Sequence, residues 1–146
     1  LYLDNDYDQE AAKVFQNAIL ANDSDGAAHQ GLGEALQKLK QYDQAVAVYL
    51  QITAAVASEV AARAQLQTGV CRLEQKRAPE AASALLAVPF TYDYPELSAL
   101  ALCEAARAFQ EMQQPAQAGK LLDRVIKEYP QSPWAEVAKE RRAQIK

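Results

Sequence analysis

The sequence predicts an all-α solenoid of about four helical hairpins, closed by a C-terminal capping helix. Two observations lead to this fold class. Half of the 146 residues are apolar but only 8% are aromatic, and alanine supplies much of the apolar share. That composition favours closely packed helices over strands. In addition, one apolar spacing pattern recurs four times along the chain.

The recurring pattern is an alanine followed by two further apolar residues at steps of four and three. These steps place the three residues on one stripe of a helix. The lead alanines are 34, 36 and 37 residues apart, which indicates stacked copies of one supersecondary unit. The four triplets are Ala11, Phe15, Ala18; Ala45, Tyr49, Ile52; Ala81, Leu85, Val88; and Ala118, Leu122, Val125.

Prolines mark several predicted helix starts. The N–H groups of the first helical turn have no acceptor within the helix, so a proline there loses no helical hydrogen bond. Pro79, Pro95, Pro115 and Pro133 each precede an apolar-periodic run. We expect the stretch 88–94 to be the one long non-helical connection. The predicted helices lie near 6–21, 25–40, 43–56, 58–76, 79–87, 95–112, 115–129 and 133–145.

The third hairpin has two possible registers. One is set by Gly69 and puts Arg72 where a large apolar residue belongs. The other is set by Leu66, Val70 and Leu73 and needs two extra residues in the turn at 76–78. Burial of apolar surface favours the second register.

The segments ahead of Ala45 and Ala118 each carry a small residue followed three positions later by a large one. These pairs, Gly33 with Leu36 and Ala106 with Phe109, resemble the first helix of the tetratricopeptide repeat (TPR) family. Two departures stand out, since the family's tryptophan and tyrosine are both replaced. The replacing residues are His29 and Leu102 for tryptophan, and Leu36 and Phe109 for tyrosine.

The resemblance covers nearly the entire chain and implies a right-handed α-α superhelix, in one TPR-like domain over 1–146. The chain opens with Leu1 instead of Met, and the first hairpin lacks its first helix. We therefore expect a fragment of a longer protein. The closing stretch 128–142, EYPQSPWAEVAKERR, resembles the last repeat of TPR proteins of the bacterial cell envelope, which implies a periplasmic or envelope-associated location ahead of a cytoplasmic one.

Charge and composition argue against several functions. Nineteen acidic residues outweigh fifteen basic ones, so we expect no nucleic-acid partner. No apolar run approaches the ~20 residues that span a bilayer. His29 is the only histidine, and Cys71 and Cys103 have no C-x-x-C spacing. We expect two buried, reduced thiols and no enzyme activity, metal or cofactor.

What remains is surface for binding. If the chain follows the family, the first helices of the hairpins line a concave face that binds a partner. The acidic Glu34 argues against the carboxylate clamp that some family members use for chaperones. The long connection offers Tyr92 and Tyr94 as secondary candidates, because aromatic side chains are favoured anchors. The concave-face candidates are Ala27, Gln30, Glu34, Gln37 and Lys38 in the second hairpin, and Leu100, Cys103, Arg107, Gln110 and Glu111 in the fourth.

The function predicted from these observations is a protein–protein interaction scaffold that binds a peptide or partner protein. Two alternatives stay open. The first is a structural spacer or self-association segment of a larger envelope protein, suggested by the alanine-rich inner face. The second is an accessory domain of an enzyme whose catalytic part is absent, because a fold does not fix a function.

Overall fold

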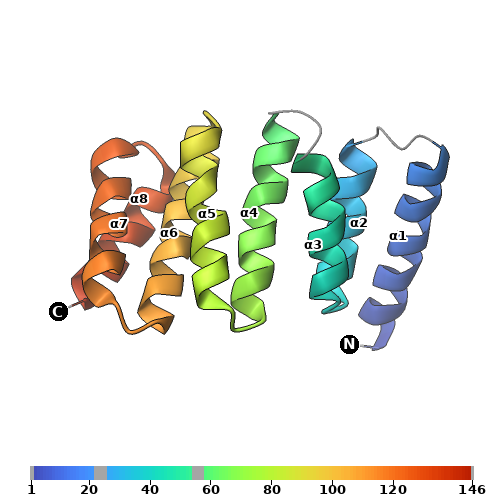
Figure 1. The fold of residues 1–146 in the computed structure, drawn as a ribbon, viewed down its shortest axis with the longest axis horizontal. Coiled ribbons are helices and arrows are strands. Elements are labelled where there is room, and N and C mark those ends of the chain that lie inside the picture. The colour runs from blue at the N-terminus through green and yellow to red at the C-terminus, as the bar shows by residue number, and fades with distance from the viewer. Residues whose placement is uncertain (1, 22–25, 54–57, 146) are drawn as a thin grey trace.

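The described residues, 2–21, 26–53 and 58–145 of the computed structural model, form eight α-helices and no strand. Figure 1 shows these helices standing side by side in chain order, from blue at the N-terminus to red at the C-terminus. The predicted all-α class is confirmed. The helices are α1 (Tyr2–Ala21), α2 (Gly26–Lys38), α3 (Tyr42–Thr53), α4 (Glu59–Glu74), α5 (Ala78–Thr91), α6 (Pro95–Glu111), α7 (Pro115–Glu128) and α8 (Pro133–Gln144).

The helices touch only their near neighbours in the chain. Each packs against the next one, and α2, α4, α6 and α8 also touch in sequence. Three hairpins result, namely α2 with α3, α4 with α5, and α6 with α7. Helix α1 packs on α2 as α3 packs on α4, and α8 packs on α7 and α6. This is the helical-hairpin superhelix that the repeats predict.

The predicted apolar stripes hold the three hairpins together. In α5 and α7 all three residues of the stripe are fully buried, and in α3 the same holds for Ala45 and Tyr49, with Ile52 only 7% exposed. In α1 the equivalent residues Ala11, Phe15 and Ala18 are only half-buried. The stripe therefore forms the core wherever helices lie on both sides of it.

Three turns of equal length join the two helices of each hairpin. Each has three residues between its helices, and the middle residue adopts the left-handed conformation without being a glycine. The φ angles are 62° at Lys40, 62° at Lys76 and 61° at Gln113. The same hydrogen bond closes each turn; in the first, the Gln41 N–H donates to the Leu36 carbonyl over 2.8 Å. The three turns thus have the same geometry.

Equal turns decide the register of the third hairpin, and the favoured prediction is wrong. A Cβ built on Gly69 would lie 2.4 Å from Cγ of Leu85, just as one on Gly33 would lie 2.4 Å from the Tyr49 ring. Gly69 therefore marks the close approach of α4 to α5. Arg72 takes the place that Leu36 has in the second hairpin.

Arg72 fits this place because its charge is neutralised. Its Nη1 donates to Asp43 Oδ1 over 3.2 Å and to Gln75 Oε1 over 2.8 Å. Leu66 and Leu73 are buried as well, in a cluster with residues of α5 and α6. The prediction from apolar burial failed because α4 buries apolar residues on two faces. An apolar stripe alone therefore did not show which face of α4 packs on α5 within the hairpin.

A second correction concerns the predicted non-helical stretch 88–94. Helix α5 continues to Thr91 with Pro89 inside it, and only 92–94 form the connection. Pro89 removes one N–H, but near the end of the helix this costs a single hydrogen bond. The Tyr92 N–H still donates to the Val88 carbonyl over 3.0 Å, closing the last turn.

The C-terminal helix begins as predicted at Ser132 and Pro133. The Ser132 hydroxyl accepts a hydrogen bond from the Trp134 N–H over 3.2 Å, which satisfies one free donor of the first turn. Ala138 is fully buried, and Trp134 packs on the same cluster. Helix α8 thus covers the end of the stack.

Some predicted boundaries lie outside the described residues, namely the start of the helix at 25 and the end of another at 56. So do the outermost positions of the domain, 1 and 146. Within the described residues, no helix has the length and apolar character needed to cross a bilayer.

Candidate functional site

A groove of about 400 Å³ lies between α2 and α4. Its walls come from two successive first helices of hairpins, with one residue from the start of α3. All six lining side chains carry a polar group, and together they define what we call the α2–α4 groove. These residues are Glu34, Gln37, Lys38, Tyr42, Gln67 and Glu74.

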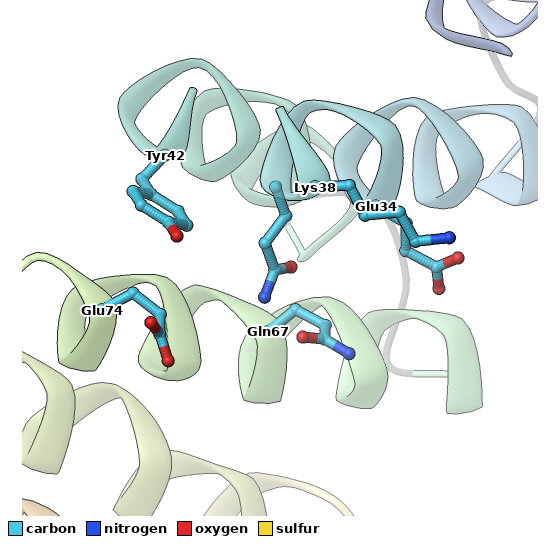
Figure 2. A pocket seen from close by; sticks show the side chains of 6 residues that line it. Glu34, Lys38, Tyr42, Gln67 and Glu74 are labelled. Atoms are coloured by element: carbon cyan, nitrogen blue, oxygen red, sulfur yellow. The ribbon is translucent and has the colours of Figure 1, made fainter. Parts of the chain in front are cut away.

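Helical spacing explains why these side chains converge. Gln37 and Lys38 follow Glu34 by three and four residues, which places both beside Glu34 on one face of α2. Gln67 and Glu74 are two turns apart on α4. In Figure 2, Glu34 and Lys38 extend side by side from one wall, and Gln67 and Glu74 line the opposite wall.

The turn at 39–41 brings a further side chain to the groove. Because the backbone of Lys40 adopts the left-handed conformation, the chain reverses sharply and α3 begins directly beside the end of α2. Tyr42, the first residue of α3, faces Glu74 across the groove (Figure 2). Partial burial, and then the nearby Glu74 carboxylate, raise the pKa of the Tyr42 phenol. It therefore stays a neutral hydrogen-bond donor near neutral pH.

Two groove residues are already engaged. Oε1 of Gln37 accepts a hydrogen bond from the buried Tyr49 hydroxyl over 3.1 Å, which leaves the Gln37 amide N–H groups as its free donors. Oε1 of Glu34 accepts from Nε2 of Gln30 over 3.0 Å. These bonds orient the α2 wall before any ligand arrives.

The other four lining residues have free polar ends. Within the described part of the chain, no hydrogen bond or ion pair joins the polar end of Lys38, Tyr42, Gln67 or Glu74 to another residue. A groove that collects donors, a carboxylate and an ammonium group in this way can bind a polar chain such as a peptide backbone.

A small polar network fixes the distance between the groove walls. Oδ1 of Asp43, at the start of α3, accepts from Nε2 of Gln75 over 2.9 Å and from Nη1 of Arg72 over 3.2 Å. The Gln75 and Arg72 hydrogen bonds lower the pKa of the Asp43 carboxyl. Asp43 adjoins Tyr42 and Gln75 adjoins Glu74, so this network positions the two residues that face each other.

The predicted residues of the fourth hairpin form a separate group on α6. Nη1 of Arg107 pairs with Oε2 of Glu104 over 2.8 Å, so its charge is partly used within the helix. Gln110 and Glu111 are exposed. None of the three lines the α2–α4 groove, and the hairpin of α4 and α5 lies between the two predicted groups.

Two other predicted candidates have packing roles. Cys103 is fully buried beneath α8, with its carbonyl accepting from Nη1 of Arg141 over 3.3 Å. It is therefore not available on the inner face, and its prediction as a contact residue is wrong. Leu100 is half-buried against the central core cluster.

The tyrosines of the 92–94 connection are half-buried. Tyr92 packs against two core clusters, and burial raises the pKa of its phenol. Tyr94 packs against one of them and precedes α6, where its carbonyl accepts from the Ser98 N–H over 2.9 Å. Their role as partner contacts remains a prediction.

The two cysteines agree with the predicted buried, reduced thiols. Cys71 and Cys103 are both free thiols and fully buried. Burial raises the pKa of each to about 11, which keeps the thiols protonated at neutral pH. His29 is 7% exposed within α2.

Sequence reasoning missed Tyr42, Gln67 and Glu74. The signal for Glu74 was present, since the 36-residue interval between the second and third hairpins carries Lys38 onto Glu74. The wrong register of the third hairpin hid this equivalence. Tyr42, the first residue of α3, belongs to neither first helix and so lay outside the faces from which candidates were predicted.

The family models that match the chain cover the repeats described above. Two family models described as Tetratricopeptide repeat match the chain, one at residues 5–60 and 31–94 and the other at residues 101–132. No curated protein matches the chain.

Solved structures share the fold over almost the whole chain. One is the crystal structure of YrrB, a TPR protein with an unusual peptide-binding site, at 25% identity and a TM-score of 0.72, covering 95% of this chain and 69% of that one. Another is a putative kinesin light chain of Podosopora anserina with nearly identical TPR-like repeats, at 19% identity and a TM-score of 0.75. It covers 99% of this chain and 80% of that one, and at this identity the likeness concerns the fold alone.

Proposed function

Because the chain belongs to the tetratricopeptide repeat family, we propose that it is a protein-binding scaffold, not an enzyme, which holds a peptide segment of a partner in the α2–α4 groove. The observation that carries this proposal is the groove itself. Four of its six lining residues have polar ends that no described residue occupies. The likeness to YrrB, a TPR protein with a peptide-binding site, supports the same reading.

The predicted residues on α6 belong to the same proposal as an outer contact region. A partner longer than the groove reaches Arg107, Gln110 and Glu111 after crossing α4, because α4 touches both α2 and α6. The double variant Arg107→Glu/Gln110→Ala then weakens binding of a long partner more than binding of a short peptide.

A display library of random peptides, selected on the immobilised chain, tests the groove. We expect the peptides that wild type enriches to be lost with Gln67→Ala/Glu74→Ala, which truncates the α4 wall. The matched control is Gln117→Ala/Glu80→Ala, which removes the same two residue types from α7 and α5, outside the groove lining. Circular dichroism verifies that all three proteins are equally helical.

The control must retain the selected peptides for the result to support the groove. Retention by the α4-wall variant as well places binding elsewhere and contradicts the proposed site. Failure of wild type to enrich any peptide contradicts peptide binding altogether.

Self-association is a second candidate, favoured by the open face of α1. Its apolar stripe is only half-buried, and Tyr7 and Val14 are 74% and 63% exposed. Sedimentation across a wide concentration range tests this candidate. A strictly monomeric chain removes it, whereas a dimer that Val14→Lys dissociates supports it.

The envelope resemblance of the closing segment supports an extracytoplasmic location as a proposal of its own. Fractionation of cells expressing the full reading frame tests it, and recovery in the cytoplasm alone contradicts it.

A further inference from the structure

The charge at one repeated position, the last residue of each first helix, differs along the stack. Helix α2 ends at Lys38, α4 at Glu74 and α6 at Glu111, and equal turns follow all three. These residues are therefore equivalent in the three hairpins. A ligand that crosses the helices meets one positive charge and then two negative ones.

The α2–α4 groove shows how this position faces a ligand. Lys38 and Glu74 line it from opposite walls. Since α6 touches α4 as α4 touches α2, the same equivalence sets Glu74 and Glu111 on the two sides of the next interval. One row of side chains thus runs across the first helices.

The two ends of the α2–α4 groove differ in charge. At one end Lys38 lies beside Glu34 (Figure 2), so their charges compensate each other locally. At the other end Glu74 faces the neutral Tyr42 phenol. Within the described residues, no ion pair engages Glu74 or Glu111. Glu74 and Glu111 are therefore the carboxylates left over for a ligand.

The spacing of the two carboxylates determines the spacing of the ligand's charges. Helices in contact lie about 8–10 Å apart. An extended peptide in the polyproline II conformation advances about 3.1 Å per residue and has three residues per turn, so side chains three residues apart lie on the same side, about 9 Å from each other. One step from α4 to α6 therefore corresponds to about three residues of such a peptide.

We infer that the ligand is an extended basic peptide with two Lys or Arg side chains about three residues apart, one opposite Glu74 beside the Tyr42 ring and the other opposite Glu111. This inference rests on the proposed function and adds the chemical class of the partner. The Tyr42 ring packs on the aliphatic part of the first basic side chain and offers its face to the cation.

Fluorescence anisotropy with defined peptide pools tests this inference. Each pool has randomised flanks and two fixed residues three positions apart, either both Lys, both Arg, both Gln or both Glu. We expect the Lys and Arg pools to bind about tenfold more tightly than the Gln pool, with each exposed ion pair contributing about threefold. The advantage should shrink as salt is added, since the carboxylates are exposed. A Lys pool with adjacent fixed residues should bind about threefold more weakly than the spaced one.

Charge variants make the test specific. Glu74→Gln and Glu111→Gln should each reduce the advantage of the Lys pool about threefold. Glu74→Lys/Glu111→Lys should reverse the preference toward the Glu pool. The double variant should fold, because Lys38 already occupies this position in α2 and a cation suits a helix C-terminus. Glu80→Lys on α5 is the matched control and should leave the Lys preference intact.

The outcomes separate the two proposals. Tightest binding of the Gln or Glu pool by wild type, lost with Gln67→Ala/Glu74→Ala, overturns the basic-peptide inference but retains the groove. A Lys preference that survives Glu74→Lys/Glu111→Lys also overturns the inference. Absence of binding by every pool and every displayed peptide removes the proposed function together with the inference.

Discussion

The two ends of the helical stack carry the same sequence pattern but bury it to different extents. At the C-terminal end, Leu122 and Val125 of α7 are fully buried because α8 covers one side and α6 the other. At the N-terminal end, Phe15 of α1 has the place of Leu122, yet it is half-buried, and α1 packs only on α2. A periodic stripe therefore identifies a helix and its inward face, whereas neighbouring helices decide how much free energy that face contributes.

The largest expected effect comes from truncating the stripe at the covered end. Leu122→Ala leaves a cavity in a cluster closed by α6, α7 and α8, and should cost about 2–5 kcal/mol of unfolding free energy. Phe15→Ala removes more atoms but from a half-buried site, and should cost about 1–2 kcal/mol. Urea denaturation measures both. Equal losses would show that the two ends are equally packed.

Glycine substitutions in α2 compare an enclosed aromatic ring with a half-buried one. A Cβ on Gly33 would lie 2.4 Å from the fully buried Tyr49 ring, and a Cβ on Gly31 would lie equally close to the half-buried Phe15 ring. Tyr49 cannot move away, since its hydroxyl is also bonded to Gln37. Gly33→Ala should therefore cost about 1–3 kcal/mol, measured by thermal unfolding. Gly31→Ala should cost clearly less, and a larger loss at Gly31 would contradict the view of an adaptable N-terminal end.

Weakening the cap of α8 should partly open the covered end. Ser132→Ala removes the hydrogen bond to the Trp134 N–H and should cost about 1 kcal/mol. As α8 frays, the Cys103 thiol should react faster with a thiol reagent, while Cys71 keeps its native rate. Mass spectrometry after pulse labelling distinguishes the two cysteines. Parallel acceleration of both thiols would indicate global unfolding instead of local opening.

The smallest expected effect lies between the two ends, at Asp43. Gln75 and Arg72, with further help from Arg77, lower the pKa of the Asp43 carboxyl in the folded chain. The Asp43 carboxylate therefore stabilises the folded chain fully above the ordinary carboxyl pKa of about 4. This stabilisation is lost as the pH falls through the lower pKa of the folded chain. Wild type should exceed Asp43→Asn in melting temperature at neutral pH, and the difference should vanish on acidification. Melting curves from neutral to acidic pH measure it. A difference that does not change with pH would show that the carboxylate charge plays no part.

Much of the fold was predictable because it rests on local periodicity. The stripes, the proline-marked starts of α6, α7 and α8, and the Ser132 cap all depend on residues within a few positions of each other. The register of the third hairpin was not predictable in this way. Its outcome depends on Arg72 meeting Asp43 from another helix, which no apolar pattern reveals.

The candidate site was predictable only in part for the same reason. Glu34, Gln37 and Lys38 follow from the face of one helix, and they do line the groove. Predicting Gln67 and Glu74 requires the correct register of a second helix. Predicting Tyr42 requires the geometry of a turn whose middle residue is in the left-handed conformation. Cys103 was misplaced because the position of α8 over α6 is a tertiary contact.

The restriction of contacts to near neighbours has a consequence for the order in which the chain acquires structure. Every pair of touching helices is adjacent or next but one in the chain, so no contact has to wait for a distant segment and loop-closure costs stay small. Among the described helices, α1 leaves the ribosome before α2 and gains its packing only when α2 appears. The α2–α4 groove forms before the cluster of α6, α7 and α8, because its helices precede those three in the chain. A stop just before Pro133 would therefore release a protein that has its groove but lacks the helix that covers α7.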